Sequence, residues 1–339
     1  MNMSSSELRR LLTTSDPSVV DDLMAEAGKV RDAVYGRRVF MRGLIEVSNH
    51  CRNNCRYCGI RRDARCQRYR LTKEQILDCC RTGYDLGFRT FVMQGGEDAW
   101  FTDEVLCDIV ATIKERFPDC AVTLSLGERS RESYRRLREA GADRYLLRHE
   151  TANREHYGYL HPSEMSFDHR MQCLHDLRDL GYQVGAGFMV GSPGQTLDTL
   201  LEDLAFIDAF RPEMVGIGPF IPATGTPFEQ EPAGSVELTL RLLALIRLMH
   251  PHVLLPATTA LGTLHPTGRE RAVKAGANVV MPNLSPQDTR ALYAIYNNKL
   301  STGSEAAESV ADIRSRLKAI GYEMPVDRGD YSNETIKPI

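Results

Sequence analysis

Three cysteines stand within eight residues in the stretch "SNHCRNNCRYCGIRRD" at positions 48–63. Cys51, Cys55 and Cys58 lie among arginines and other polar residues, which would make a poor strand or core. Thiolates are soft ligands that hold zinc or iron–sulfur clusters. The spacing C-x-x-x-C-x-x-C therefore predicts a metal centre on one short, exposed turn.

The number of protein ligands separates two kinds of metal centre. Structural zinc needs four ligands, and Cys66 or His50 could supply the fourth, which would make the segment a zinc knuckle. A four-iron cluster held by three cysteines instead leaves one iron free to bind a substrate or cofactor through nitrogen and oxygen. The spacing by itself leaves both interpretations open.

A scaffold must position this loop, and the rest of the chain repeats one theme. Four segments each indicate a helix end, a glycine and a strand buried on both faces: 85–94, 139–148, 179–190 and 274–283. Eight strands are expected near 43–48, 89–94, 121–126, 143–148, 183–190, 213–218, 252–257 and 277–281. Helices are expected between them, near 72–86, 102–116, 130–140, 167–180, 196–209, 235–249 and 267–275, with a short one after Pro286.

Eight βα units predict an α/β fold closed as a (β/α)8 TIM-type barrel. The alternative is an open doubly wound sheet, but the cysteines stand where its glycine fingerprint would be. The barrel is expected at 41–300, with an N-terminal helical extension at 1–40 and a C-terminal extension at 301–339 that contains a helix near 304–320. Loops after the strands share one face of such a barrel, so functional residues should converge there.

Composition limits the partners of the chain. Lysine and arginine number 42 against 45 acidic residues, and a net charge of -3 gives no reason to expect nucleic acid or a membrane. No apolar run reaches the length of a membrane span, and the first residues lack a signal-peptide core, so we expect a cytoplasmic protein. Of the nine cysteines, Cys79, Cys80, Cys107, Cys120 and Cys173 are expected as small, mostly buried hydrophobic residues rather than disulfide partners.

The cysteine motif, placed directly after the first strand, resembles the signature of the radical S-adenosylmethionine (SAM) superfamily. The resemblance implies one 4Fe–4S cluster whose open iron binds SAM and passes on the electron that yields a 5'-deoxyadenosyl radical. Implied SAM-binding residues are Tyr57, Gln94, Gly95, Gly96, Thr123, Ser125, Glu150, Arg170, Met189 and Ile217. Each also has a plain structural alternative: a tight turn at the glycines, an internal ion pair at "RHE" (148–150), a solvated helical charge at Arg170.

Longer segments are similar to the HydE family of radical SAM maturases of FeFe-hydrogenase: "RYLLRHETAN", "GYQVGAGFMVGSPGQT", "MVGIGPFIP", "PATTALGT" and "GANVVMPN". This likeness implies that the radical acts on a small-molecule iron complex, a cysteine-bound iron carbonyl and cyanide species, with transient contact to the maturases HydG and HydF. The implied substrate-binding residues are Arg148, Thr258, Thr259, Tyr293 and Tyr296.

Two departures from the HydE pattern stand out. No cysteine follows Cys173, so a second, C-terminal cluster is not expected, and Gly95 replaces a serine expected beside SAM. Three alternatives stay open: sulfur insertion as in biotin synthase, amino-acid isomerisation as in methylornithine synthase, and a zinc-stabilised protein that only carries a metal complex.

Overall fold

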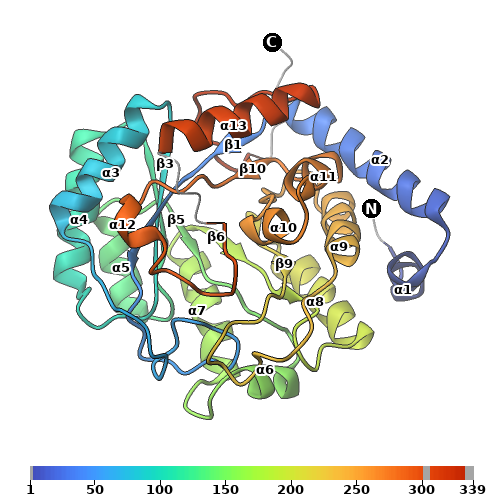
Figure 1. The fold of residues 1–339 in the computed structure, drawn as a ribbon, viewed down its shortest axis with the longest axis horizontal. Coiled ribbons are helices and arrows are strands. Elements are labelled where there is room, and N and C mark those ends of the chain that lie inside the picture. The colour runs from blue at the N-terminus through green and yellow to red at the C-terminus, as the bar shows by residue number, and fades with distance from the viewer. Residues whose placement is uncertain (1–2, 301–305, 333–339) are drawn as a thin grey trace.

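Parallel strands form the centre of the chain, and helices surround them (Figure 1). The computed structural model describes residues 3–300 and 306–332. Six strands pair continuously, in the order β2 (Gly43–Ser48), β3 (Thr90–Gly95), β4 (Ala121–Ser125), β5 (Arg144–Leu146), β6 (Gln183–Ala186) and β8 (Met214–Val215). Strand order follows chain order throughout, as expected for successive βα units.

Shorter pairings close this sheet into a ring. Met214 of β8 pairs with Leu254, and Pro256 pairs with Val279 of β10 (Val279–Val280). β10 then pairs with β1 (Phe40–Met41), and a bridge between Asn283 and Leu44 returns to β2. The predicted closed barrel is confirmed, and the open doubly wound sheet is wrong.

Three expected strands are shorter or more broken than predicted. The segment at 252–257 forms only isolated bridges, because Pro256 has no N–H to donate to a ladder. The segments at 183–190 and 213–218 each divide, giving the separate strands β7 (Met189–Val190) and β9 (Gly218–Pro219). Gly187 separates β6 from β7 with a φ of +150°, and a Cβ there would lie 2.0 Å from the carbonyl oxygen of Gly216.

The outer helices match the predicted spans within a few residues. They are α3 (Lys73–Asp85), α4 (Asp103–Arg116), α5 (Arg131–Glu139), α7 (Phe167–Asp179), α8 (Leu197–Phe210), α9 (Val236–Met249), α11 (Gly268–Lys274) and α12 (Gln287–Arg290). Thr72 and Gln75 form the predicted capping box at the start of α3. Two short helices were not predicted, α6 (Arg154–Leu160) and α10 (Thr259–Leu264); both follow strand segments at the mouth of the barrel.

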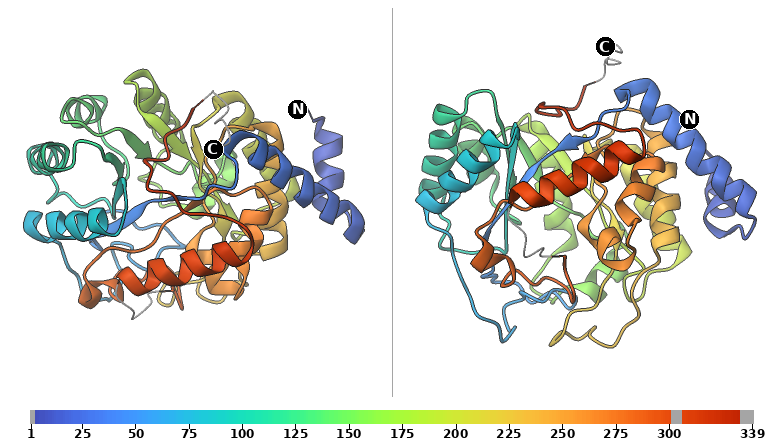
Figure 2. Two further views of the ribbon diagram at one scale, coloured as in Figure 1. Left: turned by 90° about the horizontal axis from the view of Figure 1, so that it is seen from above. Right: turned by 45° about the horizontal axis from the view of Figure 1, so that its top comes forward.

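Both ends of the chain cover the outside of the barrel. The helices α1 (Ser5–Thr13) and α2 (Pro17–Tyr35) lie along one side, next to α9 (Figure 2). The expected C-terminal helix is α13 (Ala306–Ala319), whereas residues 301–305 and 333–339 of the predicted extension lie outside the described residues. No helix of the described ranges is both long and apolar enough to cross a bilayer.

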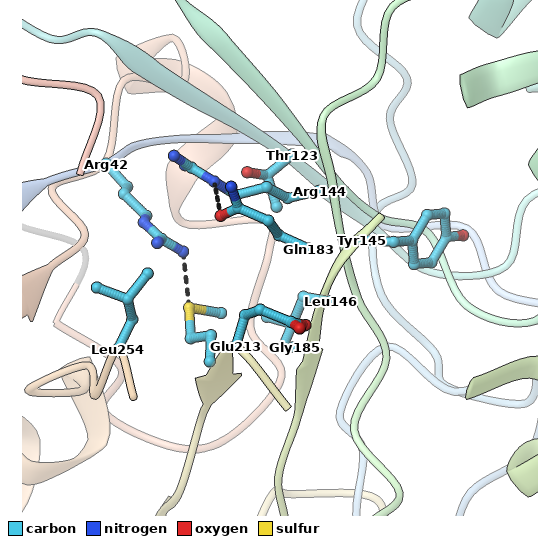
Figure 3. Close-up of a pocket in the computed structure, with 10 residues that line it drawn as sticks. Arg42, Thr123, Arg144, Tyr145, Leu146, Gln183, Gly185, Glu213 and Leu254 are labelled. Carbon is cyan, nitrogen blue, oxygen red and sulfur yellow. Dashed lines mark hydrogen bonds between the residues drawn. The ribbon is translucent and has the colours of Figure 1, made fainter. Parts of the chain in front are cut away.

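The end of the barrel away from the cysteines has a polar floor (Figure 3). Arg144 donates 3.1 Å to Oε1 of Gln183, 3.0 Å to the carbonyl oxygen of Arg328, and to Asp330 at 2.5 Å. The C-terminal segment therefore seals this end through Arg144. A space of about 10 Å³ remains among these side chains, the size of one water molecule.

Candidate active site

The three motif cysteines line one cavity at the mouth of the barrel, with a volume of about 380 Å³. Their loop leaves β2 and is tied by backbone hydrogen bonds to three separate parts of the chain. The N–H of Arg52 donates to Glu97, that of Arg56 to Leu160, and that of Gly59 to Ile295, at 2.9, 3.0 and 2.9 Å. The loop is therefore held in place before any metal binds, although it contains no helix or strand.

Arg68 organises the same loop from inside. Its guanidinium donates to the carbonyl oxygens of Ile60, Arg61 and Ala64 at 2.9, 2.7 and 3.1 Å, and also to that of Asn49. One forked cation thereby satisfies several carbonyls of an irregular segment that has no sheet to pair with. Sequence reasoning did not single out Arg68, because an arginine within an arginine-rich stretch carries no distinguishing pattern.

Burial sets the protonation of the cysteine thiols. It raises the pKa of Cys58 to about 12, and it raises the pKa of Cys51 and, further, that of Cys55 above the ordinary thiol value. Metal ligands must be thiolates, so each thiol releases a proton as iron binds.

The zinc alternative finds no fourth ligand in this arrangement. Cys66 is exposed, and no three His, Cys, Asp or Glu side chains within residues 3–300 and 306–332 converge on one ion. Zinc–sulfur bonds of about 2.3 Å in a tetrahedron place sulfur atoms roughly 3.8 Å apart. A four-iron cluster needs no convergence on one ion, because each thiol binds a different iron, so this finding disfavours single zinc but not a cluster.

Gly96 lets the cysteine loop pack against the end of β3. A Cβ on this residue would lie 2.2 Å from the carbonyl oxygen of His50 and 2.7 Å from the Cβ of Cys51. The sequence predicted glycine here so that the backbone could approach a ligand. The structure adds a second reason: the cysteine loop occupies the space that a side chain on Gly96 would need. Gln94 and Gly95 line the cavity beside it, and so does Ser125 at the end of β4.

Tyr57 is positioned by a neutral histidine. Its hydroxyl lies 3.2 Å from Nε2 of His161, and Nδ1 of that ring lies 2.9 Å from the carbonyl oxygen of Tyr157. Burial lowers the pKa of His161 to about 3, so the ring is uncharged near neutral pH. The carbonyl requires the proton on Nδ1, which leaves Nε2 to accept from the Tyr57 hydroxyl. Tyr57 lines the cavity together with the three cysteines, and its predicted contact with SAM stays a prediction.

Arg148 and Glu150 follow β5 and form an ion pair of 3.1 Å between Nη2 and Oε2. Apart from this ion pair, Nε and Nη2 of Arg148 and Oε2 of Glu150 are buried and form no hydrogen bond within the described residues, and both residues line the cavity. Glu150 has a φ of +64°, a left-handed conformation that costs a non-glycine residue about 1–2 kcal/mol. Buried polar atoms without hydrogen bonds and backbone strain are both typical of ligand-binding positions, so the roles predicted for Arg148 and Glu150 stay predictions that this geometry allows.

Arg170 is not the solvated helical charge that was the structural alternative for this residue. Its side chain is buried, and Nε donates 2.6 Å to Oε1 of Glu128 while Nη1 donates 2.6 Å to the carbonyl oxygen of Arg148. Arg170 also lines the cavity, so it links the end of β5 to the metal side of the site.

The remaining predicted residues divide between the cavity and its surroundings. Arg148, Thr258, Thr259, Tyr293 and Tyr296, the expected substrate residues, all line the cavity, and so does Met189. Ile217 is buried in the barrel wall, although its neighbours Gly216 and Gly218 face the cavity. Thr123 is not brought to the cavity: it lines the small space at the barrel floor, one layer below Ser125 on β4.

A buried ion pair in the cavity wall was missed from the sequence. Lys299 pairs with Glu46 of β2, and Nδ2 of Asn283 donates 2.9 Å to the other carboxylate oxygen. Burial raises the pKa of Glu46, and Lys299 opposes that rise. The ammonium also donates 3.0 Å to the carbonyl oxygen of Tyr293. A glutamate inside the apolar strand "GLIEVS" indicated a buried charge that needs a partner. The partner, Lys299, could not be identified from the sequence because it lies 253 residues away.

Comparison with known proteins agrees with this geometry. Residues 45–207 match the Radical SAM superfamily. The chain is 44% identical to the FeFe hydrogenase maturase subunit HydE of Thermotoga maritima over 95% of this chain and 92% of that protein. It is 29% identical to 3-methylornithine synthase of Methanosarcina barkeri, over 97% and 92% of the two chains.

Comparison with solved structures shows that the similarity extends over the whole fold. A crystal structure of methylornithine synthase (PylB) superimposes with a TM-score of 0.87 at 28% identity, covering 96% of this chain and 94% of that one. Near-complete coverage of both chains means that the barrel and its extensions correspond, beyond the cysteine motif alone. The chain is thus a radical SAM enzyme, and it belongs to the family of the hydrogenase maturase subunit HydE.

Proposed function

We propose that this enzyme uses a SAM-derived radical on a cysteine-bound iron carbonyl and cyanide complex during assembly of the FeFe-hydrogenase cofactor. The proposal depends on one observation above all: Arg148, Glu150 and Thr258, which carry buried polar atoms without hydrogen bonds within the described residues, line the same cavity as the three cysteines. A cavity of about 380 Å³ lies in the range of small-molecule sites. Its wall therefore needs a polar ligand to complete its hydrogen bonds.

The metal side of the cavity suits SAM. Cys51, Cys55 and Cys58 would hold one 4Fe–4S cluster, which when bound would supply the electron for cleavage of SAM to methionine and a 5'-deoxyadenosyl radical. Glu150 can accept hydrogen bonds from ribose hydroxyls, and Arg170 is a forked cation that suits the SAM carboxylate. Tyr57, held by His161, borders the adenine.

Residues at the ends of several strands complete the proposed SAM site. Its members are Gln94, Gly95, Gly96, Ser125 and Met189, with the backbone beside Ile217. Thr123 lines the space at the barrel floor, so its side chain is not part of the proposed SAM site.

The opposite wall suits the cysteine part of the substrate. Nε of Arg148 and the Thr258 hydroxyl are buried without a hydrogen-bond partner within the described residues, and Nη2 of Arg148 contacts Glu150 as an ion pair without a hydrogen bond. A guanidinium and a hydroxyl that point into a mostly apolar cavity bind a carboxylate and keep water from the radical. Thr259, Tyr293 and Tyr296 line the same wall.

We also propose that the enzyme holds a single cluster, works in the reducing cytoplasm and contacts two partner proteins. No cysteine follows Cys173, so the chain has no thiols for a second, C-terminal cluster. All nine cysteines are free, which fits the cytoplasm. Transient contact with HydG and HydF follows from the role of a HydE-type maturase.

Anaerobic turnover tests the proposal. The reconstituted enzyme is incubated with SAM, dithionite and the cysteine-bound iron complex; 5'-deoxyadenosine is measured, and the iron product is followed by electron paramagnetic resonance. We expect the wild type and a Cys66→Ala control to release 5'-deoxyadenosine. Cys51→Ala should release none, although its circular dichroism spectrum should match that of the wild type. Release that increases with free amino acids but not with the iron complex would favour an isomerase like methylornithine synthase. One zinc per chain without iron would favour the metal carrier.

A further inference from the structure

A buried histidine and a buried aspartate lie behind Glu150, and no step proposed above uses either of them. His149 directly precedes Glu150 after β5, and Asp203 lies on α8. Both side chains are 0% exposed, and Nε2 of His149 lies 3.3 Å from Oδ1 of Asp203. Neither is among the described residues that line the cavity, so the pair can reach a ligand only through the residues that it holds.

Gly187 determines which ring nitrogen of His149 carries the proton. The backbone N–H of Gly187 donates to Nδ1 of His149 at 3.3 Å. A nitrogen that accepts this bond carries no proton, so the ring proton lies on Nε2 and faces the Asp203 carboxylate. This contact between Nε2 and Oδ1 is close, although it does not meet the geometry of a hydrogen bond. The histidine therefore lies between a backbone donor and a carboxylate that attracts its N–H.

The partners of His149 also hold the backbone on either side of it. The carbonyl oxygen of Gly187 accepts from the N–H of Glu150 at 3.0 Å. Oδ1 of Asp203 accepts from the N–H of Ala152 at 2.6 Å. Gly187 thus binds His149 through its N–H and Glu150 through its carbonyl, while Asp203 binds the residues that follow. Residues 149–152 are therefore fixed from two neighbouring βα units.

Aromatic packing limits rotation of the His149 ring. Its centroid lies 4.6 Å from that of Phe206 on α8 and 5.8 Å from that of Phe188. Phe188 also pairs with Glu150 in an isolated parallel β-bridge. A ring with a fixed orientation and a fixed tautomer can hold the next residue in an unfavourable backbone conformation, and Glu150 has such a conformation, with a φ of +64°.

We infer that His149 and Asp203 are positioning residues that hold the Glu150 carboxylate in place for the ribose hydroxyls of SAM. Glu150 would touch the ligand, and the other two residues act through it. Without their contacts, residue 150 relaxes out of the left-handed conformation, and its side chain turns away from the cavity. The inference rests on the proposed SAM site, and it adds two residues to that site which do not themselves line the cavity.

The alternative is a buried pair that only stabilises the barrel. The two roles predict different effects on binding. A purely structural pair supports every contact with SAM equally, so its loss weakens binding whether or not the ligand carries ribose hydroxyls. A positioning pair acts on one contact, so its loss removes only the affinity that the hydroxyls contribute.

The affinity ratio between SAM and 2',3'-dideoxy-SAM therefore tests the inference. Both ligands are titrated calorimetrically into anaerobically reconstituted enzyme without reductant, so that no SAM is cleaved. His149→Phe keeps an aromatic ring and removes both nitrogens. Asp203→Asn keeps an oxygen for the N–H of Ala152 but places an amide beside Nε2. The matched control is His250→Asn, which removes a contact of 3.4 Å to Asp208, also on α8.

We expect wild type and the control to bind SAM about tenfold more tightly than the dideoxy analogue, and the ratio to fall to about two or less in His149→Phe and Asp203→Asn. Crystal structures of these two variants without metal should show residue 150 outside the left-handed region. A ratio equal to that of wild type in either folded variant would overturn the inference.

Glu150→Gln separates this failure from failure of the proposed function. If Glu150→Gln lowers the ratio but His149→Phe and Asp203→Asn do not, Glu150 binds ribose without the help of the pair, and only the inference is lost. If the ratio is near one already in wild type and stays there in Glu150→Gln, the proposed ribose contact is wrong, and the inference is lost with it.

Discussion

The buried pair of Glu46 and Lys299 allows a quantitative test of the cavity wall. The side chains are 0% and 9% exposed, so neither charge has water as an alternative partner. Lys299→Met keeps the length of the side chain and removes only the ammonium. Removal of one member of a buried pair costs about 3–5 kcal/mol, because the other charge is left uncompensated.

Protonation of Glu46 limits this loss and makes it depend on pH. The pKa of Glu46 is already raised by burial above its ordinary value of 4.5, and loss of Lys299 raises it further. When folded Glu46 holds a proton that the unfolded chain releases, stability falls by about 1.4 kcal/mol for each pH unit above the unfolded pKa. The expected loss relative to wild type is therefore small in acid and grows by up to about 1.4 kcal/mol for each pH unit above the folded wild-type pKa of Glu46.

Urea unfolding followed by circular dichroism at several pH values measures these free energies. Glu46→Gln combined with Lys299→Met should recover most of the loss and remove its pH dependence, because no charge stays buried. A matched control is Lys73→Met, which breaks an exposed pair with Asp108 and should cost less than about 1 kcal/mol at every pH. A loss that is the same at all pH values, or a double variant no more stable than Lys299→Met, would refute the reasoning and assign Lys299 a packing role.

Three further predictions concern the ligands. Arg148→Lys should weaken binding of the cysteine-bound iron complex about tenfold and SAM less than twofold, since a point charge loses the fork; equal losses in calorimetric titrations would assign Arg148 to SAM. Arg170→Gln should weaken SAM binding more than tenfold in the same titrations, and unchanged SAM affinity would limit Arg170 to its pair with Glu128. Gly96→Ala should lower the iron content of reconstituted enzyme by half or more, because its Cβ displaces the cysteine loop. The control Gly158→Ala, which has open space around the new Cβ, should leave the iron content unchanged. Equal iron contents in the two variants would show that the loop adapts.

The barrel could be predicted because its signals are local. A helix end, a left-handed glycine and a buried strand follow one another within about ten residues, and Gly87, Gly141, Gly181 and Gly276 all have positive φ as that pattern requires. The cysteine loop was equally local, since all three ligands come from one turn. The short helices α6 and α10 lacked such signals, because seven or fewer residues show no helical period.

Sequence could not predict side-chain burial where it depends on a long-range partner. Arg170, predicted at the SAM site, is buried against Glu128 on the loop after β4, and no spacing rule joins residues of different βα units. Thr123 and Ser125 share one face of β4, as the period of two predicts, yet they lie in different layers of the barrel. Sequence gives the face of a strand residue, but its depth in a barrel depends on how neighbouring strands are staggered.

Glu150 shows why the mouth of this barrel differs from its floor. At the floor, Arg144 has partners on every side, and the C-terminal segment completes them. At the mouth, Glu150 stays in a left-handed conformation because its N–H donates 3.0 Å to the carbonyl oxygen of Gly187, which fixes the backbone across the strand ends. A relaxed, extended residue would turn its side chain to the other face of the chain. The strain therefore keeps the Glu150 carboxylate at the cavity, where Oε2 forms an ion pair with Arg148 but no hydrogen bond within the described residues.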